Sequence, residues 1–323
     1  MTAADAGAPR LGGAAAIRRA ADVLAPLEPG ARVALVATSG PVDPARLDRS
    51  MALLRSWGLQ PVAYPSASAR HPRADYLAGD DAVRAGDLST AWCDPSIAAV
   101  FCLRGGYGSI RLLDRLDVDR LRSAPPKALF GSSDVTAVHE LWNGRLATPT
   151  WFGPMLGTDA LLEDAVATEG LRRAVFEPLP GREYSSPGTE TLVAGTATGR
   201  VVGGTLSLLR MTLGSAESDG LDRSGAIVLL EDVTEEPYRL DALLSSLLRA
   251  GWFEGVAGIA LGSWESCGDP SEVRALMLEL LGPLGVPLVW DLGFGHCANA
   301  HTLPLGIEAT LHADGRPRLV VHG

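Results

Sequence analysis

The first half of the chain alternates short apolar runs with longer segments that are apolar on one side. Residues 32–37 form a continuous apolar run, which predicts a buried strand, and residues 44–57 carry apolar side chains at helical spacing. The same patterns predict further strands at 61–64, 97–103 and 127–130, and helices at 81–91, 110–116 and 136–142. Buried strands separated by helices are typical of a parallel, doubly wound sheet, so we expect an α/β fold.

The second half has a more mixed pattern. It predicts helices at 206–209, 240–250 and 271–281, and strands at 226–230, 256–261, 287–290, 309–311 and 318–321. Between the halves the periodicity weakens, and Pro, Gly and Ser crowd residues 178–188, which is typical of a linker. We therefore expect a disordered tail at 1–17, an N-terminal domain at 18–174, a linker at 175–191 and a C-terminal mixed α/β domain at 192–323.

Composition narrows the class of protein. A chain of 323 residues that is 46% hydrophobic can bury a large core and is long enough for two domains. Its net charge of −10, without any basic run, argues against a nucleic-acid partner. The four cysteines are widely spaced, and no segment approaches the ~18 apolar residues of a membrane helix. We expect a cytoplasmic protein with neither a nucleic-acid nor a membrane partner.

Small hydroxyl residues stand where the strand at 127–130 passes into the helix at 136–142. Residues 130–136 read Phe-Gly-Ser-Ser-Asp-Val-Thr. In such a turn a serine Oγ is exposed, and the first N–H groups of the helix are free to hold an oxyanion. Serine before a helix is also a common N-cap, so the local sequence leaves both a nucleophile and a cap open.

A carboxylate and a histidine occupy comparable places in the second half. Glu231 directly follows the strand at 226–230, and His296 lies in a Gly-rich turn, where small neighbours let a substrate approach. Ligands bind beyond the carboxyl ends of parallel strands, so these side chains are candidates for catalysis. The chain order Ser, Glu, His also occurs in α/β-hydrolases, but their Gly-x-Ser-x-Gly elbow is absent. If the chain is a hydrolase, these residues belong to a different hydrolase architecture.

Five ordered blocks carry a more specific resemblance. They are Arg-Gly-Gly-Tyr-Gly at 104–108, Gly-Ser-Ser-Asp-Val-Thr at 131–136, Leu-Glu-Asp-Val at 230–233 with Pro-Tyr-Arg-Leu-Asp at 237–241, Gly-Phe-Gly-His at 293–296, and Thr-Leu-Pro-Leu-Gly at 302–306. Together they resemble the L,D-carboxypeptidase family, serine peptidases grouped with the microcin C self-immunity peptidases. The blocks span roughly residues 33–311, which is nearly the whole chain.

The resemblance implies a fold and an activity. The expected fold is an N-terminal Rossmann-like domain joined to a C-terminal α/β domain, in a homodimer without a metal or an organic cofactor. The expected activity is release of the terminal D-alanine from murein tetrapeptide during peptidoglycan recycling. The nucleophile falls on Ser133, because the family's serine directly precedes an aspartate, and the triad is completed by Glu231 and His296.

The same resemblance implies an oxyanion hole made of backbone N–H groups. One donor is Asp134, and the other is Gly105 or Gly106, between which the sequence does not decide. A carboxypeptidase must also bind the terminal carboxylate of its peptide, for which an arginine is the natural partner. Arg104 and Arg239 are candidates for that contact, although a structural role is open for each.

Three departures from the family affect the expected pocket. Ser132 replaces the usual aromatic residue before the nucleophile, residues 150–154 read Thr-Trp-Phe-Gly-Pro, and Thr205 stands in place of asparagine in the Gly-Gly-Asn-Leu block. Tyr107 and Trp151 are further candidates for substrate contact, and Trp151 with Phe152 suits a nucleobase. An aminoacyl-nucleotide substrate of the microcin C type is therefore an alternative, and a catalytically silent muropeptide-binding protein is another.

Other polar residues allow competing interpretations. His139 follows the serine turn and is expected to pack or cap rather than act as the base. Cys297 beside His296 suggests a thiol nucleophile only weakly, because neighbouring side chains in an extended segment point apart. Asp232 is expected to be an ordinary surface acid, as are Glu235 and Glu236. His301 with His296 lacks the further ligands of a metal site.

Overall fold

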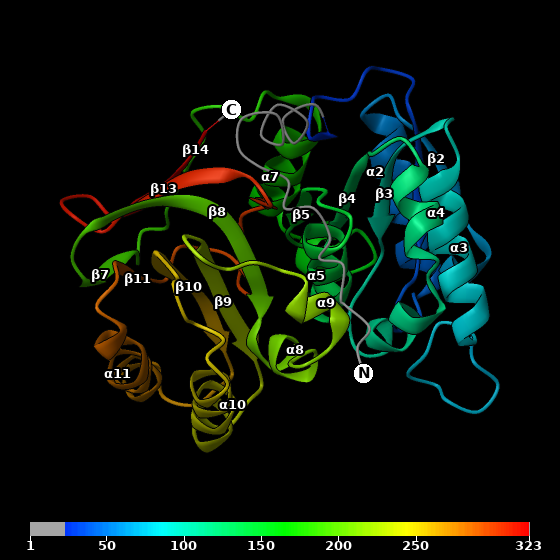
Figure 1. Cartoon of the computed structure of the whole chain (residues 1–323). Coiled ribbons are helices and arrows are strands. Elements are labelled where there is room, and N and C mark those ends of the chain that lie inside the picture. Colours follow the sequence, from blue (N-terminus) through cyan, green and yellow to red (C-terminus); the bar gives the residue numbers. More distant parts are fainter. Residues whose placement is uncertain (1–22, 323) are drawn as a thin grey trace.

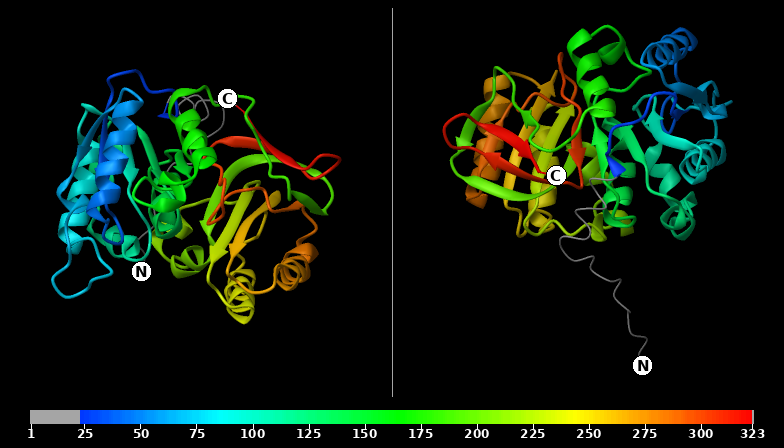
Figure 2. Two further views of the ribbon diagram at one scale, coloured as in Figure 1. Left: turned by 180° about the vertical axis from the view of Figure 1, so that it is seen from behind. Right: turned by 90° about the horizontal axis from the view of Figure 1, so that it is seen from above.

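The computed structural model describes residues 23–322, which form two sheets and the helices that cover them (Figure 1). The predicted disordered tail at 1–17 lies outside the described residues. Figure 2 gives two further views of the same arrangement. No helix within residues 23–322 is both long and apolar enough to cross a membrane.

The first sheet has the strand order β12-β5-β4-β3-β1-β2. Strands β1 to β5 run parallel to their neighbours, whereas β12 from the end of the chain joins β5 antiparallel. The strands are β1 (Arg32–Val36), β2 (Gln60–Ala63), β3 (Ile97–Cys102), β4 (Ala128–Gly131), β5 (Thr150–Phe152) and β12 (Leu303–Leu305). The helices of this half are α2 (Pro44–Ser56), α3 (Asp81–Cys93), α4 (Val118–Ser123), α5 (Thr136–Gly144), α6 (Asp159–Leu162) and α7 (Ala165–Phe176), with the 3-10 turns η1 (Pro65–Ala67), η2 (Ser109–Arg115) and η3 (Ser133–Val135).

The second sheet has the order β6-β14-β13-β8-β9-β10-β11-β7 and is parallel only from β8 to β11. Its strands are β6 (Glu183–Tyr184), β7 (Glu190–Val193), β8 (Thr196–Thr205), β9 (Ile227–Val233), β10 (Gly258–Glu265), β11 (Leu288–Trp290), β13 (Glu308–His312) and β14 (Arg318–Val321). Its helices are α8 (Leu206–Met211), α9 (Ala216–Asp219), α10 (Pro237–Arg249) and α11 (Pro270–Leu281), with the 3-10 turn η4 (Gly282–Leu284). The mixed α/β fold expected from the sequence is confirmed.

Side-chain caps and buried strands explain these elements. Asp43, Asp80, Asp164 and Asp269 each accept backbone N–H groups at the first turn of a helix, which satisfies donors that the helix itself cannot pair. The central strands are buried on both faces, as their unbroken apolar runs predict. One hydrophobic core is continuous from the first sheet into the second, so the two halves share packing.

Several features differ from the pattern read off the sequence, and three of them bear on the site or the domain boundary. The predicted helix at 110–116 is the 3-10 turn η2. The segment predicted as a linker, 175–191, contains β6 and the first residues of β7, both of which pair in the second sheet. Ten-residue β8 is missing from the prediction because its glycines and threonines hide the strand pattern, and it leads directly into α8.

Candidate active site

Ser133 lies at the turn from β4 into α5, with its backbone in the left-handed region at φ 56°. A non-glycine residue rarely adopts this conformation, and such strain clusters at active sites. The hydroxyl of Ser132 makes no capping hydrogen bond to the following turn. His139, on α5, instead binds the carbonyl of Gly131 at 3.1 Å, and burial lowers its pKa to about 4. The expectation that His139 packs in the interior is therefore confirmed.

The glycine turn after β3 lies directly against the Ser133 turn. A Cβ added to Gly105 would stand 2.8 Å from both Cβ and Oγ of Ser133. The carbonyl of Gly105 accepts the N–H of Gly40 at 3.1 Å, and the N–H of Ser109 binds the carboxylate of Asp134 at 2.7 Å. These bonds fix the glycine turn beside Ser133 from both ends.

A buried arginine supports the far end of the same turn. Arg84 is fully buried on α3 and donates to the carbonyl of Gly108 at 2.9 Å and to the carbonyl of Thr38. Its charge is paired with Asp81, which also binds Arg111. Gly108 has φ 127°, and a Cβ there would meet the Arg84 guanidinium at 2.6 Å, so the turn needs glycine at this position.

Glu231 and His296 form a hydrogen-bonded pair. His296 Nδ1 and Glu231 Oε2 lie 2.7 Å apart, with the Glu231 side chain fully buried and the His296 side chain 28% exposed. Burial by itself lowers the pKa of His296, but the hydrogen bond and the charge of Glu231, with Asp232 behind it, raise it above its ordinary value. Because Nδ1 is bound to the carboxylate, Nε2 is the ring nitrogen left to exchange a proton with a reacting group.

The two halves meet where β8 reaches α5. Thr205, the last residue of β8, accepts no capping bond but donates its hydroxyl to Glu231 Oε1. Its backbone N–H binds Thr136 Oγ1 at 3.1 Å, three residues after Ser133. Among residues 23–322, Ser133 Oγ and the His296 ring make no direct hydrogen bond, and such bonds often tighten only when substrate binds. From the sequence, Thr205 stood out only because it replaces the asparagine of the Gly-Gly-Asn-Leu block, and its contact with Glu231 was not predicted.

The candidate substrate residues occupy different environments. Arg104 is half-buried and donates to the carbonyl of Pro41 at 3.1 Å, while Tyr107 is 40% exposed beside the glycine turn. Arg239 is exposed and paired with Glu235. These three remain at or near the surface of the protein.

Trp151 is a core residue, contrary to the expectation that it contacts substrate. It is 1% exposed, stacks on Phe130 with ring centroids 5.9 Å apart, and has the guanidinium of Arg182 over its ring. Phe152 is equally buried. Both lie on β5, between β4 and β12, so neither can stack on a nucleobase in this conformation.

Two neighbours of the Glu231–His296 pair differ in environment from ordinary surface residues. Asp232 is 2% exposed, and burial together with the charge of Glu231 raises its pKa to about 6, so the expectation of a surface acid is wrong. One of its oxygens accepts the N–H of Ser207 at 2.7 Å. Burial raises the pKa of Cys297 to about 11, which opposes a thiolate nucleophile. His301 binds the carbonyl of Ser185 at 3.0 Å.

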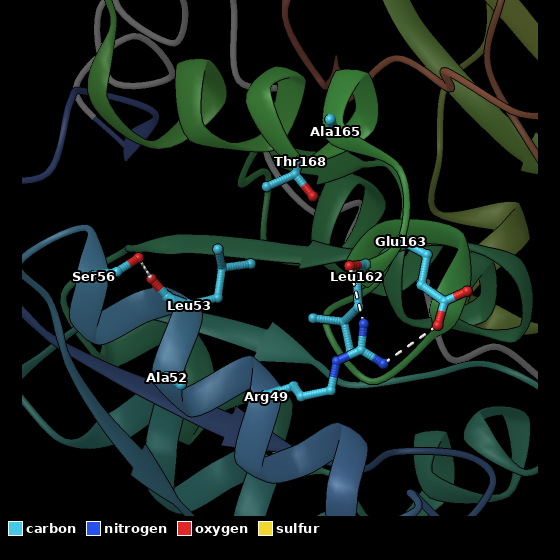
Figure 3. Close-up of a pocket in the computed structure, with 8 residues that line it drawn as sticks. All are labelled: Arg49, Ala52, Leu53, Ser56, Leu162, Glu163, Ala165 and Thr168. Carbon is cyan, nitrogen blue, oxygen red and sulfur yellow. Dashed lines mark hydrogen bonds and ion pairs between the residues drawn. The ribbon is translucent and has the colours of Figure 1, made fainter.

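A separate surface hollow lies between α2 and the segment of α6 and α7 (Figure 3). Its polar groups are already paired: Arg49 binds Glu163 and the carbonyl of Leu162, Ser56 binds the carbonyl of Leu53, and Thr168 binds that of Leu161. The hollow contains none of the residues of the Ser133, Glu231 and His296 cluster.

Comparison with known proteins gives consistent matches along the chain. Residues 33–153 match the family described as LD-carboxypeptidase N-terminal domain, and residues 198–311 match LD-carboxypeptidase C-terminal domain. A protein of Streptomyces coelicolor named as a carboxypeptidase is 49% identical over 89% of this chain and 92% of its own length. The murein tetrapeptide carboxypeptidase of Pseudomonas aeruginosa is 33% identical over 88% of this chain and 94% of its own.

Solved structures agree with the fold. The muramoyltetrapeptide carboxypeptidase of Oxalobacter formigenes superposes with a TM-score of 0.78 at 26% identity, covering 90% of this chain and 99% of that one. An MccF-like protein of Bacillus anthracis gives a TM-score of 0.81 at 22% identity, covering 92% and 98%. The second likeness is one of fold.

Proposed function

Because this chain belongs to the LD-carboxypeptidase family, we propose that it is a serine peptidase that releases the terminal D-alanine of murein tetrapeptide. The observation that carries the proposal is the 2.7 Å hydrogen bond between buried Glu231 and His296. Thr205 links this pair to the strained Ser133 turn, because its hydroxyl donates to Glu231 and its backbone N–H binds Thr136. A buried carboxylate that orients an imidazole is the arrangement that activates a serine. Relatives named as murein peptidases over most of their length support the choice of substrate.

The reaction follows from the roles of these side chains. Ser133 Oγ attacks the carbonyl carbon of the scissile bond while His296 Nε2 takes the hydroxyl proton. Glu231 holds the ring tautomer and stabilises the imidazolium without taking the proton. His296 then protonates the departing amine of D-alanine, which leaves an acyl ester on Ser133. Water, activated by the same histidine, hydrolyses that ester and regenerates the hydroxyl. No step requires a cofactor or a metal.

The oxyanion forms beside the glycine turn. We assign its donors to the backbone N–H groups of Asp134 and Gly106. In a trans peptide the C=O and N–H point in opposite directions, and the carbonyl of Gly105 is bound to Gly40. The N–H of Gly106, in the same peptide unit, therefore points away from Gly40. This geometry favours Gly106 over Gly105 as the second donor.

The terminal carboxylate of the peptide is assigned to Arg104. Its guanidinium donates to a backbone carbonyl and forms no ion pair with a carboxylate among residues 23–322, whereas Arg239 is paired with Glu235. Arg104 immediately precedes the glycine turn that touches Ser133. Tyr107, exposed on the same turn, is assigned to the rim of the pocket.

Mass spectrometry of the products tests the proposal. The panel contains murein tri-, tetra- and pentapeptides with an aminoacyl sulfamoyl adenosine. We expect D-alanine only from the tetrapeptide, no turnover by Ser133→Ala and turnover by Ser132→Ala. Cleavage of the adenosine compound alone would replace this substrate with the microcin C type, and binding of a muropeptide without cleavage by the folded protein would replace catalysis with binding.

The proposal includes the setting of the enzyme. The family resemblance implies a homodimer in the cytoplasm, where peptides released from the wall are recycled. Analytical ultracentrifugation of the purified protein measures the first point, and fractionation of cells measures the second. A monomer at micromolar concentration, or recovery outside the cytoplasm, contradicts that part of the proposal.

A further inference from the structure

Thr205 occupies a position where threonine normally serves its own helix. It is the N-cap residue of α8, and a threonine there usually accepts an N–H from the first turn. Its hydroxyl makes no such bond and donates instead to Glu231 Oε1. Asp232, next to Glu231, accepts the N–H of Ser207 in that first turn. The carboxylate of Asp232 thus takes over the capping, which frees the Thr205 hydroxyl.

The backbone of Thr205 makes the second contact. Its N–H binds Thr136 Oγ1 at 3.1 Å, and Thr136 opens α5, the helix that follows Ser133. Gly204 permits this approach: its φ is 144°, and a Cβ there would lie 2.6 Å from Thr136 Oγ1. One residue therefore contacts the nucleophile helix through its main chain and the triad carboxylate through its side chain.

The register of the sheet makes these contacts specific. Thr205 and Glu231 are direct partners on the parallel strands β8 and β9. Both are buried, at 2% and 0% exposure, so solvent does not weaken the bond between them. With Oε1 held by Thr205, the other carboxylate oxygen, Oε2, lies against His296 Nδ1.

We propose that Thr205 is a positioning residue for catalysis, which holds Glu231 toward His296 and fixes this pair relative to the Ser133 turn. The inference rests on the proposed serine mechanism but not on the identity of the substrate. Its contribution comes through the chemical step rather than through substrate binding, because Thr205 acts on the triad from the buried side of Glu231.

Thr205→Val tests the role of the hydroxyl, since valine keeps the branched shape and loses only the donor. We expect kcat for D-alanine release to fall about tenfold with KM within about twofold of the wild type, as for the loss of a bond to a charged catalytic group. Thr205→Ser restores the hydroxyl and is expected to retain at least about half of the wild-type kcat. Thr136→Val, which removes the acceptor of the Thr205 N–H, is expected to lower kcat in the same direction.

Thr212→Val is the matched control. Thr212 is also buried and also donates to a buried carboxylate, Glu140, but outside the triad. This variant is expected to lose thermal stability and keep its kcat. Thr205→Val with wild-type kcat, Thr205→Ser as damaged as Thr205→Val, or an equal loss of kcat in Thr212→Val would each overturn the proposal. If Thr205→Val does not fold, Thr205→Ala takes its place in the same comparison.

Covalent labelling separates this inference from the choice of substrate. A fluorophosphonate forms a P–O bond to Ser133 Oγ, fluoride leaves, and the hydroxyl proton passes to His296. Intact mass gives the rate of labelling, which is expected to fall about tenfold in Thr205→Val and not in Thr212→Val. If the wild type is labelled but leaves murein tetrapeptide intact, the substrate is wrong and the role of Thr205 is still decided. Labelling rates that are equal in wild type and Thr205→Val contradict the role itself.

Discussion

Replacing Gly105 by alanine places a methyl group against Ser133, the proposed nucleophile. The added Cβ would lie 2.8 Å from Ser133 Cβ and Oγ and 3.3 Å from the backbone nitrogen of Asp134. Apolar contacts are comfortable from about 3.5 Å, so the serine side chain must move by roughly 0.7 Å. A displacement on the order of 1 Å at a reacting centre costs about 10²-fold in rate. We therefore expect kcat to fall by about 10- to 100-fold in Gly105→Ala.

The same change has a smaller effect on folding. Gly105 does not have a positive φ, so alanine adopts its backbone conformation without strain. Overpacking of a core site lowers the free energy of unfolding by about 1–3 kcal/mol. Alanine restricts the unfolded chain more than glycine does, which raises the free energy of unfolding by about 0.4–1 kcal/mol. We expect a net loss of at most about 2.6 kcal/mol, visible as a modest fall in Tm.

The assay follows D-alanine release with D-amino acid oxidase, beside the thermal unfolding of each variant. Gly86→Ala is the control: Gly86 lies within α3, and a Cβ there would meet nothing within 4 Å. It is expected to keep full activity with unchanged or higher stability. A folded Gly105→Ala that retains kcat within about twofold would refute the argument that the glycine turn and Ser133 are in functional contact.

Three further perturbations follow from the buried charges. In NMR titrations the pKa of His296 is expected above 6.5 in the wild type and below 6.5 in Glu231→Gln. The variant loses the hydrogen bond and the charge that raise this pKa, while the burial that lowers it stays. An unchanged pKa contradicts the pairing of Glu231 with His296. Asp232 binds its proton more tightly when folded, so its contribution to stability is lost as pH rises through about 6. Asp232→Asn should therefore flatten the dependence of Tm on pH between about 4 and 7, and parallel curves refute this. Arg223→Met leaves Glu140, its partner at 2.8 Å, buried and unpaired, so urea unfolding should show a loss of about 3–5 kcal/mol with unchanged kcat; a loss under about 1 kcal/mol would contradict it.

The parallel sheet and the serine turn could be predicted from the sequence because each is marked by a short stretch of neighbouring residues. The apolar runs that became β1, β3, β4 and β9 are buried on both faces, and the turn at Ser133 lies at a strand end that the pattern itself marks. The pairing of Glu231 with His296 could not be predicted from the pattern of apolar and polar residues alone. Their 65-residue separation is bridged only by the fold, and the family resemblance supplied that pairing in advance.

Trp151 and Asp232 show where sequence reasoning failed. The aromatic pair Trp151 and Phe152 fits a pocket wall or a short buried strand equally well. In the structure β12 pairs antiparallel with β5, and both aromatic side chains are buried. An acid beside Glu231 is usually solvated, but Asp232 faces the start of α8 and replaces the cap that Thr205 does not provide. Both outcomes depend on strands distant in the sequence, which local periodicity does not report.

The proposed chemistry depends on positions where a side chain is missing. A Cβ at Gly105 would strike Ser133 Oγ at 2.8 Å, one at Gly204 would strike Thr136 Oγ1 at 2.6 Å, and one at Gly295 would strike Glu231 Oε2 at 2.6 Å. Each glycine lies in a different sequence block. Each lets its own backbone come close to a residue that the proposed mechanism uses. Gly204 and Gly295 also have positive φ, so alanine there would add backbone strain to the clash. In the proposed mechanism, these glycine-rich turns are what allows a serine from one half of the chain and a Glu–His pair from the other to act at a single site.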